Sequence, residues 1–248
     1  PNHVKAHNNL GVILLQTGKP QKAISSYQKA IEINPNYIDA HNNLGAVFKQ
    51  LGELQKAKSC YEKIIEINPN YAEAHNNLGA ILHELGEDQK AKSCYEKAIE
   101  INPTNAVAHN NLGAAFKQSG EYQKAISSYE KAIRINPNYA VAHNNLGNAF
   151  KELGEYKKAI SCYEKAIQIQ PNYAGSYLNL GNVLKELGEY QKAKSFYQKA
   201  IEINPKFSSA NLNLGIIFEE LGEFRKAINC YEKALKLNPD SINAQASI

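Results

Sequence analysis

Apolar residues recur along this chain at the spacing of amphipathic helices. In residues 38–51 (IDAHNNLGAVFKQL) apolar positions include Ala40, Leu44, Val47 and Phe48, and polar residues lie between them. Intervals of three and four residues place these side chains on one face of a helix. The pattern therefore predicts a first helix over this segment, with one buried face and one polar face.

A second helical pattern follows after a short break. Gly52 favours a turn, because glycine adopts the left-handed backbone conformation that commonly ends a helix. The next stretch, residues 54–67 (LQKAKSCYEKIIEI), carries Ala57 and Tyr61 on one side at helical spacing. It ends before Pro69, since the residue preceding a proline is pushed out of helical geometry. Each unit is thus predicted to be a helix–turn–helix hairpin.

The hairpin pattern returns every 34 residues. Proline marks the same point of each period: Pro1, Pro35, Pro69, Pro103, Pro137, Pro171, Pro205 and Pro239. We divide the chain into seven repeats and a partial eighth: 1–34, 35–68, 69–102, 103–136, 137–170, 171–204, 205–238 and 239–248. A fixed period of this length is typical of solenoids, in which each unit buries its apolar surface against its neighbours. The sequence predicts an all-α fold, one α-solenoid array of about fourteen helices without strands.

A helical wheel of the first helix separates a buried arc from a polar arc. The predicted buried arc holds Ala40, His41, Leu44, Gly45, Val47, Phe48 and Leu51. The polar arc holds Asp39, Asn42, Asn43, Ala46, Lys49 and Gln50. Glycine inside a helix costs about 1 kcal/mol relative to alanine. We therefore expect Gly45, at the edge of the buried arc, to permit the close approach of another helix.

Charge and composition disfavour a nucleic-acid or membrane surface. The 248 residues carry a formal net charge of +4, and lysines and glutamates are interleaved rather than gathered into a basic block. No run of about 18 apolar residues occurs, so no membrane-spanning segment is predicted. Because the chain starts in phase with a repeat and stops inside a helix pattern, we expect it to be a piece of a longer protein.

These features resemble the tetratricopeptide repeat family along essentially the whole chain. The second repeat carries the family's signature residues: Leu44-Gly45, Phe48, Gly52, Ala57, Tyr61 and Pro69. His41 stands where the family often has tryptophan, and Ile64 where it usually has alanine. The resemblance implies a right-handed superhelix whose first helices line an inner groove and whose second helices form an outer wall. It also implies protein–protein recognition without catalysis by the repeats.

The most regular feature of the implied groove is an asparagine at one position of all seven first helices. These residues are Asn9, Asn43, Asn77, Asn111, Asn145, Asn179 and Asn213. A side-chain amide offers a donor and an acceptor, as a peptide group does, so the row could hold an extended chain without reading its side chains. In this the repeats resemble those of the O-linked N-acetylglucosamine transferase family, whose superhelix carries an asparagine ladder for peptide backbones. Alternatively, the amides bond to neighbouring helices and only fix the stacking of repeats.

Two further rows complete the candidate binding residues. A second asparagine row consists of Asn8, Asn42, Asn76, Asn110 and Asn144. It gives way to Leu178 and Leu212, so the groove is expected to become more apolar toward its C-terminal end. A basic row consists of Lys49, Lys117, Lys151 and Lys185. It favours carboxylate-bearing ligands, but a glutamine or glutamate follows each lysine, so solvated charges are an equal interpretation.

Some family members grip the C-terminal carboxylate of chaperones with a clamp of asparagines and cations. Only Asn148 and Asn179 match that set, and all three of its cations are missing. We therefore predict no carboxylate clamp.

The cysteines and histidines predict packing rather than chemistry. The four cysteines share one position of their repeats: Cys60, Cys94, Cys162 and Cys230. Repeats lie roughly 10 Å apart, too far for a disulfide or for a shared metal ion. The same spacing separates His7, His41, His75, His109 and His143. We expect reduced thiols, hydrogen-bonded histidines, no metal, no cofactor and a cytoplasmic setting. No catalytic constellation is present, so no enzyme activity is predicted for these repeats.

The sequence as a whole predicts a scaffold that binds an extended peptide or protein segment in its groove, as the recruitment module of a larger protein. Three alternatives stay open. The array could self-associate through its apolar ends, read RNA as other helical repeats do, or be an engineered consensus-like protein. The monotonous ladders disfavour RNA, which requires variable base-reading residues, and the drift between repeats disfavours engineering. We expect no nucleic-acid or membrane partner.

Overall fold

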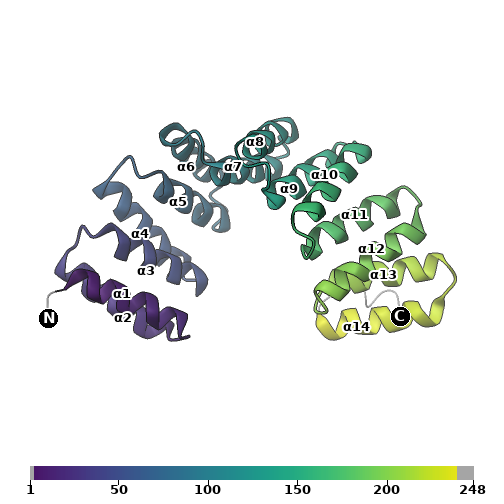
Figure 1. Cartoon of the computed structure of the whole chain (residues 1–248), viewed down its shortest axis with the longest axis horizontal. Helices are drawn as coiled ribbons and strands as arrows, with labels where there is room; N and C mark the ends of the chain where they lie inside the picture. Colours follow the sequence, from purple (N-terminus) through teal and green to yellow (C-terminus); the bar gives the residue numbers. More distant parts are fainter. Residues whose placement is uncertain (1–2, 239–248) are drawn as a thin grey trace. The chain divides into compact units, whose positions relative to one another are not determined.

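The computed structural model describes residues 3–238, and within them the chain forms fourteen α-helices and no strand (Figure 1). The first helices of the seven repeats are α1 (Val4–Gln16), α3 (Ile38–Gln50), α5 (Ala72–Glu84), α7 (Ala106–Gln118), α9 (Ala140–Glu152), α11 (Ala174–Glu186) and α13 (Ser208–Glu220). The second helices are α2 (Pro20–Ile33), α4 (Leu54–Ile67), α6 (Asp88–Ile101), α8 (Tyr122–Ile135), α10 (Tyr156–Ile169), α12 (Tyr190–Ile203) and α14 (Phe224–Leu237). The all-α prediction is confirmed. The partial eighth repeat, residues 239–248, lies outside the described residues.

Each hairpin turn depends on one glycine. Gly52, between α3 and α4, has a φ of +75°, and the glycines at the same place of the other repeats have similar values. This conformation lets the Glu53 N–H donate to the Phe48 carbonyl at 2.8 Å and the Gly52 N–H donate to the Lys49 carbonyl at 3.0 Å. These two bonds form a Schellman motif, which ends α3. The predicted turn is therefore confirmed.

A second set of glycines, in the middle of the first helices, lets the two helices of a hairpin approach closely. A Cβ atom on Gly45 would lie 2.9 Å from Cζ of Tyr61, and one on Gly79 would lie 2.7 Å from Cε1 of Tyr95. The same contact recurs in later repeats: Gly147 with Tyr163, Gly181 with Tyr197 and Gly215 with Tyr231. The buried tyrosine ring thus fills the space that a side chain would need, which confirms the predicted close approach.

The buried face of α3 agrees with the helical wheel except at its end. Its buried residues are Ala40, His41, Leu44, Gly45, Val47 and Phe48. Leu51, which the wheel placed on the buried arc, is exposed. The reason is that α3 ends at Gln50, so Leu51 already belongs to the turn. An arc drawn for a continuous helix does not apply to a residue beyond its end.

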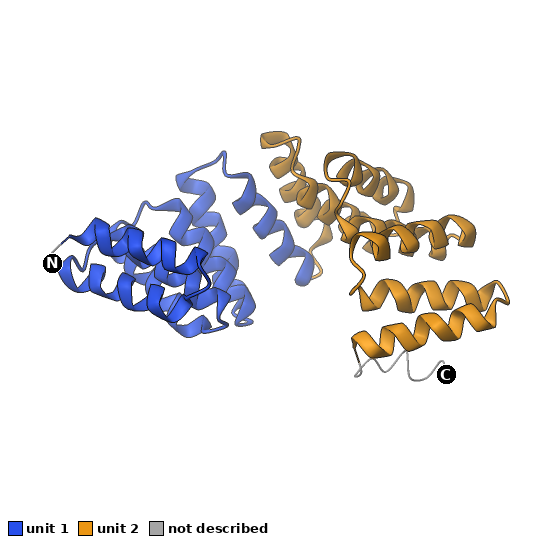
Figure 2. Ribbon diagram, turned by 60° about the horizontal axis from the view of Figure 1, so that its bottom comes forward, with its two compact units in different colours: residues 1–119 blue, residues 120–248 orange. Residues whose placement is uncertain are grey.

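The helices fall into two compact units, unit 1 with residues 1–119 and unit 2 with residues 120–248 (Figure 2). In unit 1 the helices of each complete hairpin pack together, and the second helix of each repeat packs on the first helix of the next. Unit 2 follows the same rule from α8 to α14. Each unit is therefore a stack of helical hairpins. The boundary follows α7, inside the fourth repeat, and the organisation as a single array stays a prediction.

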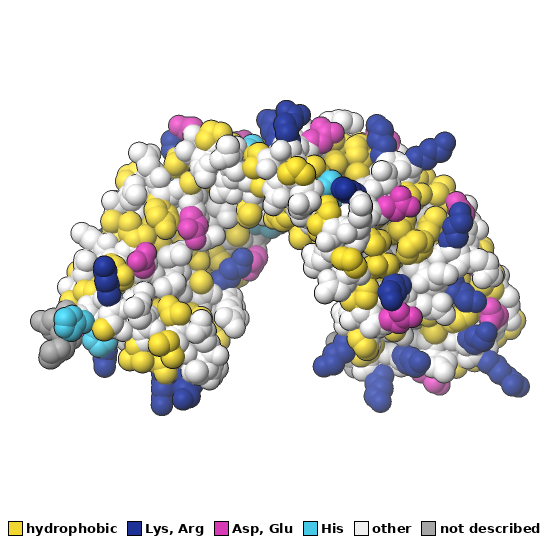
Figure 3. All heavy atoms as spheres, viewed as in Figure 1, with side chains coloured by type: hydrophobic (Ala, Val, Ile, Leu, Met, Phe, Trp, Pro, Cys, Tyr) yellow, Lys and Arg dark blue, Asp and Glu magenta, His cyan; other side chains and the backbone are white. Residues whose placement is uncertain are grey.

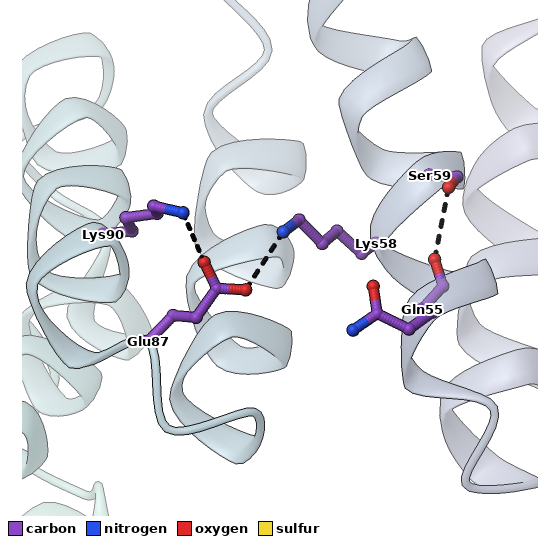
Figure 4. A network of polar contacts seen from close by, with 5 residues as sticks. All are labelled: Gln55, Lys58, Ser59, Glu87 and Lys90. Atoms are coloured by element: carbon purple, nitrogen blue, oxygen red, sulfur yellow. Dashed lines mark hydrogen bonds and ion pairs between the residues drawn. The ribbon is translucent and has the colours of Figure 1, made fainter.

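The second helices carry charges that link neighbouring repeats. Lys58 of α4 lies 3.1 Å from the carboxylate of Glu87, and Lys90 contacts the same carboxylate (Figure 4). In unit 2, Lys194 lies 3.6 Å from Glu223 at the equivalent place. Lysines and acidic residues are interspersed over the visible face of each unit (Figure 3), as expected for a solvated surface.

Candidate functional site

The asparagine at the shared position of each first helix forms a hydrogen-bonded row in each unit. We call this row the asparagine ladder and its surface the ladder face. In unit 1 the ladder amide donates to Oδ1 of an asparagine one repeat earlier: Asn43 to Asn8 (3.0 Å), Asn77 to Asn42 (3.5 Å) and Asn111 to Asn76 (3.1 Å). The ladder residues are half-buried, except Asn9, which is exposed. These bonds join neighbouring first helices. The ladder amides therefore do bond to a neighbouring helix, as the alternative to ligand binding supposed.

The second asparagine row lies beneath the ladder. Asn8, Asn76, Asn110 and Asn144 are only 6%, 8%, 5% and 5% exposed, whereas Asn42 is half-buried. Asn76 accepts the bond from Asn111 and donates to Asn77 Oδ1 at 3.5 Å. The four buried members present little surface to a ligand and orient the ladder residues instead. The wheel could not show this, because the next repeat, not the helix itself, covers them.

In α3, α5 and α7 these bonds join into a continuous chain of amides. Its members are Asn42, Asn77, Asn76, Asn111 and Asn110. Such a chain holds successive amides in a fixed orientation. An asparagine amide has two N–H groups and one carbonyl oxygen, and each cross-repeat bond uses only one N–H of the ladder residue. The ladder face of unit 1 therefore retains hydrogen-bonding capacity.

Unit 2 departs from this arrangement where leucines replace the second row. Leu178 takes the place of an asparagine acceptor, and Asn213 donates instead to Asn182 Oδ1 at 2.8 Å. The same oxygen accepts a bond from the Tyr197 hydroxyl at 2.9 Å. In the preceding repeat the ladder bond keeps its usual form, from Asn179 to Asn144 at 3.0 Å.

Asn182 and its counterpart Asn148 are residues whose role the sequence analysis missed. The Tyr163 hydroxyl donates to Asn148 Oδ1 at 2.8 Å, as Tyr197 does to Asn182. The sequence carried a signal: a polar residue directly after the mid-helix glycine, where unit 1 has alanine or valine. Recognising it required knowing that the tyrosine ring crosses that glycine.

The basic row is partly neutralised by acids of the following repeat. Lys49 lies 3.0 Å from Glu84, and Lys151 lies 3.9 Å from Glu186. Within residues 3–238, Lys117 and Lys185 have no carboxylate within ion-pairing distance. The row therefore offers two unpaired cations rather than a continuous basic stripe. At Lys49 and Lys151 the acidic neighbours reduce the positive charge.

The histidines fasten the start of each first helix. Nε2 of His41, His75, His109 and His143 lies 2.8–3.0 Å from the carbonyl oxygen of the proline that opens the repeat. Tyr177 makes the same contact to Pro171 through its hydroxyl, at 3.0 Å. The expectation of hydrogen-bonded histidines is confirmed. Tyrosine can replace histidine here because its hydroxyl donates to the same proline carbonyl oxygen.

Two of the cysteines line open pockets between repeats. A cavity of about 510 Å³ is lined by His41, Cys60 and neighbouring residues, and one of about 410 Å³ is lined by His143 and Cys162. All four cysteines are free. Burial raises the pKa of Cys60 and Cys162 to about 11, so both thiols are protonated near neutral pH. Residues 3–238 contain no group of three or more His, Cys, Asp or Glu that could hold a metal ion.

Comparisons with known proteins agree with this geometry. Models of the tetratricopeptide repeat match residues 37–104, 94–127, 174–207 and 208–241. A further model, described as TPR repeat, matches residues 11–52, 115–154 and 147–188. The chain therefore belongs to the tetratricopeptide repeat family. A search of curated proteins finds no match, and the likeness to glycosyltransferase repeats stays a prediction.

Several solved structures share the fold. PilF of Pseudomonas aeruginosa is 23% identical, with a TM-score of 0.74 over 84% of this chain and 95% of that chain. YrrB, described as a TPR protein with an unusual peptide-binding site, is 24% identical, with a TM-score of 0.56 over 75% of this chain and 96% of that chain. MamA is 31% identical, with a TM-score of 0.57 over 66% of this chain and 95% of that chain.

The helices between residues 3 and 238 were also compared with the requirements of a membrane span. None of them combines the length and the apolar character that crossing a bilayer demands.

Proposed function

We propose that this chain is a scaffold that binds an extended peptide or protein segment along its ladder face, as the recruitment module of a larger protein. The observation that carries the proposal is the ladder itself. Each described ladder bond fixes one amide and leaves its second N–H for a ligand, and Asn43 also retains its carbonyl oxygen. These groups match the acceptor and donor of a peptide bond. No catalytic role or cofactor belongs to the proposal.

Geometry and entropy favour this use of the ladder. Repeats lie about 10 Å apart, and an extended chain advances ~3.3 Å per residue, so one rung meets about every third residue of a ligand. Amides already held by a neighbouring repeat lose less freedom when a ligand binds. The same cross-repeat bond thus joins neighbouring repeats and orients the amides toward a ligand. The stacking and the peptide-binding interpretations of the ladder are therefore compatible.

The neighbouring cations and the fold give secondary support. Lys117 and Lys185 are available to acidic side chains of a ligand at two separated points. YrrB carries a peptide-binding site on the same fold, although a likeness at 24% identity shows the fold alone. The proposal therefore rests on the residues of the ladder face.

The test is capture of peptides from a broad library of disordered sequences. We compare the parent with Asn77→Ala, Asn111→Ala, Asn145→Ala, and with a control carrying the same change at three exposed turn residues, Asn36, Asn70 and Asn138. Circular dichroism and unfolding midpoints verify the fold of each variant. We expect that some peptides bind to the parent and to the control but not to the ladder variant. Equal capture by all three proteins would reduce the ladder to a stacking device.

Self-association is a second candidate function, favoured by one observation. Leu10 and Ile13 of α1 are 47% and 56% exposed, whereas their counterparts Leu44 and Val47 are buried. On α14, Ile228 is likewise exposed where Ile24 and Ile126 are buried. A second copy could cover both faces by repeating the packing found between repeats. Sedimentation equilibrium tests this: mass should rise with concentration in the parent and not in Leu10→Lys, Ile13→Lys.

A further inference from the structure

A tyrosine of the second helix packs its ring against the mid-helix glycine of the first helix. The ring crosses the mid-helix glycine of the first helix in the same way in both units: Cε1 of Tyr95 lies 2.7 Å from the Cβ position of Gly79, and Cε1 of Tyr163 lies 2.6 Å from that of Gly147. The hydroxyl of Tyr163 then reaches Asn148, the residue after the glycine. The hydroxyl end of each ring therefore lies beside that residue.

In unit 2 these hydroxyls are used inside the protein. Tyr163 donates to Asn148 at 2.8 Å and Tyr197 donates to Asn182 at 2.9 Å. Asn182 also accepts the bond from ladder residue Asn213 at 2.8 Å. The hydroxyl of Tyr197 and the amide of ladder residue Asn213 thus share one acceptor, Asn182 Oδ1. This tyrosine position therefore lies next to the ladder.

In unit 1 the same hydroxyls have no protein partner. Ala46 and Ala80 occupy the place of Asn148, and their methyl side chains offer no hydrogen-bond acceptor. Tyr61 and Tyr95 are only 3% and 2% exposed, and neither makes a side-chain hydrogen bond within residues 3–238. No described side-chain nitrogen or oxygen is both shielded from solvent and unbonded, so the small exposed part of each tyrosine includes its hydroxyl. A donor on an otherwise buried ring is rarely left without a partner.

We propose that the hydroxyls of Tyr61 and Tyr95 are ligand-binding groups of unit 1, donating to main-chain carbonyl oxygens of the segment held by the ladder. This inference rests on the proposed peptide-binding function and adds a set of contact residues to it. The ring is held by packing and the hydroxyl alone meets the ligand, so the donor is fixed in place before binding. Unit 2 lacks this contact because Asn148 and Asn182 occupy its hydroxyls.

The surroundings keep both hydroxyls in the protonated, donating form. Burial raises the pKa of Tyr61 to about 12, with Cys60 and Glu73 adding to the effect. Burial also raises the pKa of Tyr95, to which Cys94, Glu84 and Asp88 add. Both hydroxyls therefore remain protonated donors near neutral pH. A protonated hydroxyl can donate to a main-chain carbonyl oxygen of the bound segment.

The test uses a probe with peptide groups and almost no side chains, acetyl-(Ser-Gly)6-amide, titrated into ¹⁵N-labelled protein. Tyr61→Phe, Tyr95→Phe removes the two hydroxyls of unit 1, and Tyr163→Phe, Tyr197→Phe is the matched control in unit 2. We expect roughly tenfold weaker binding for the unit 1 variant and a change below about twofold for the control.

A second variant reaches the same hydroxyls without removing them. Ala46→Asn, Ala80→Asn supplies the acceptors that unit 2 has, and should weaken binding to the same extent as the phenylalanine variant. Unchanged binding in both unit 1 variants, together with a loss in Asn77→Ala, Asn111→Ala, would overturn this inference and leave the ladder proposal standing. An equal loss in the unit 1 and unit 2 phenylalanine variants would also overturn it. Absence of probe binding to the parent would count against the main-chain clamp and the hydroxyls together.

Discussion

In unit 1 the ladder residues Asn77 and Asn111 bond to asparagines of the preceding repeat, whereas in unit 2 Asn213 bonds to Asn182, one turn further along α11. The change follows from Leu178, which occupies the usual acceptor's place and packs with apolar residues of its unit. The ladder bond is kept with a different acceptor. In both units a hydrogen bond between asparagine side chains therefore joins neighbouring first helices. It does so in unit 2 even though Leu178 replaces an asparagine of the second row.

The packing beneath these polar rows is the same in the two units. The glycine–tyrosine contact has nearly the same length at Gly79 and at Gly181, 2.7 Å and 2.6 Å to the Cβ position. Tyr95 and Tyr197 are both almost fully buried. The apolar contacts define the hairpin, so the polar surface can vary without changing the fold. The comparison separates residues that specify the fold from residues that are available for recognition.

The largest expected effect comes from removing a tyrosine ring of the glycine–tyrosine contact that both units share. Tyr95→Ala in unit 1 and Tyr197→Ala in unit 2 should each lower the free energy of unfolding by about 3–5 kcal/mol, the range for large buried side chains. Because repeats contact mainly their neighbours, each loss should centre on its own unit. Amide hydrogen exchange measures this: protection should fall first in the unit that carries the substitution. Equal loss of protection throughout both units would contradict it.

A smaller effect distinguishes the hydroxyls of the two units. Tyr197→Phe removes a hydrogen bond to Asn182 and should lower the free energy of unfolding by about 1 kcal/mol. Tyr95→Phe removes a hydroxyl without a protein partner and should leave stability within about 0.5 kcal/mol of the parent. Urea unfolding monitored by circular dichroism provides both values. Equal losses would show that the Tyr95 hydroxyl has a partner inside the fold.

The smallest expected effect is electrostatic and common to both units. Hydrogen bonds from Lys90 and then from Lys58 hold the pKa of Glu87 below its ordinary value of 4.5, and a hydrogen bond from Lys226 does the same for Glu223. The folded-state pKa is the lower one, so this contribution to stability is present at neutral pH and is lost as pH falls through the folded value. We expect a small drop of the urea midpoint as the pH falls below the ordinary range of glutamate titration. The drop should shrink in Glu87→Gln and Glu223→Gln alike; a difference between the units would show unequal ion pairing.

Much of the fold follows from local properties of the chain. Gly52 predicts its turn because the left-handed conformation is intrinsic to glycine, and Pro69 predicts a helix end because its ring acts on the residue before it. The 34-residue period then carries each local prediction to every repeat. The candidate site was predictable in part: the ladder position is half-buried and polar, as the wheel indicates at Asn43.

What the tertiary structure alone decided is the partner of each polar side chain. Asn42 and Asn43 are consecutive asparagines on the same arc of the wheel, yet residues equivalent to Asn42 are mostly buried and those equivalent to Asn43 reach the surface. The helix does not distinguish them, because the next repeat covers one and not the other. The same applies to Tyr61 and Tyr197, which both pack their rings against the mid-helix glycine of the first helix. Whether their hydroxyls are satisfied depends on one residue of the facing helix, since a hydrogen bond requires an acceptor within about 3 Å.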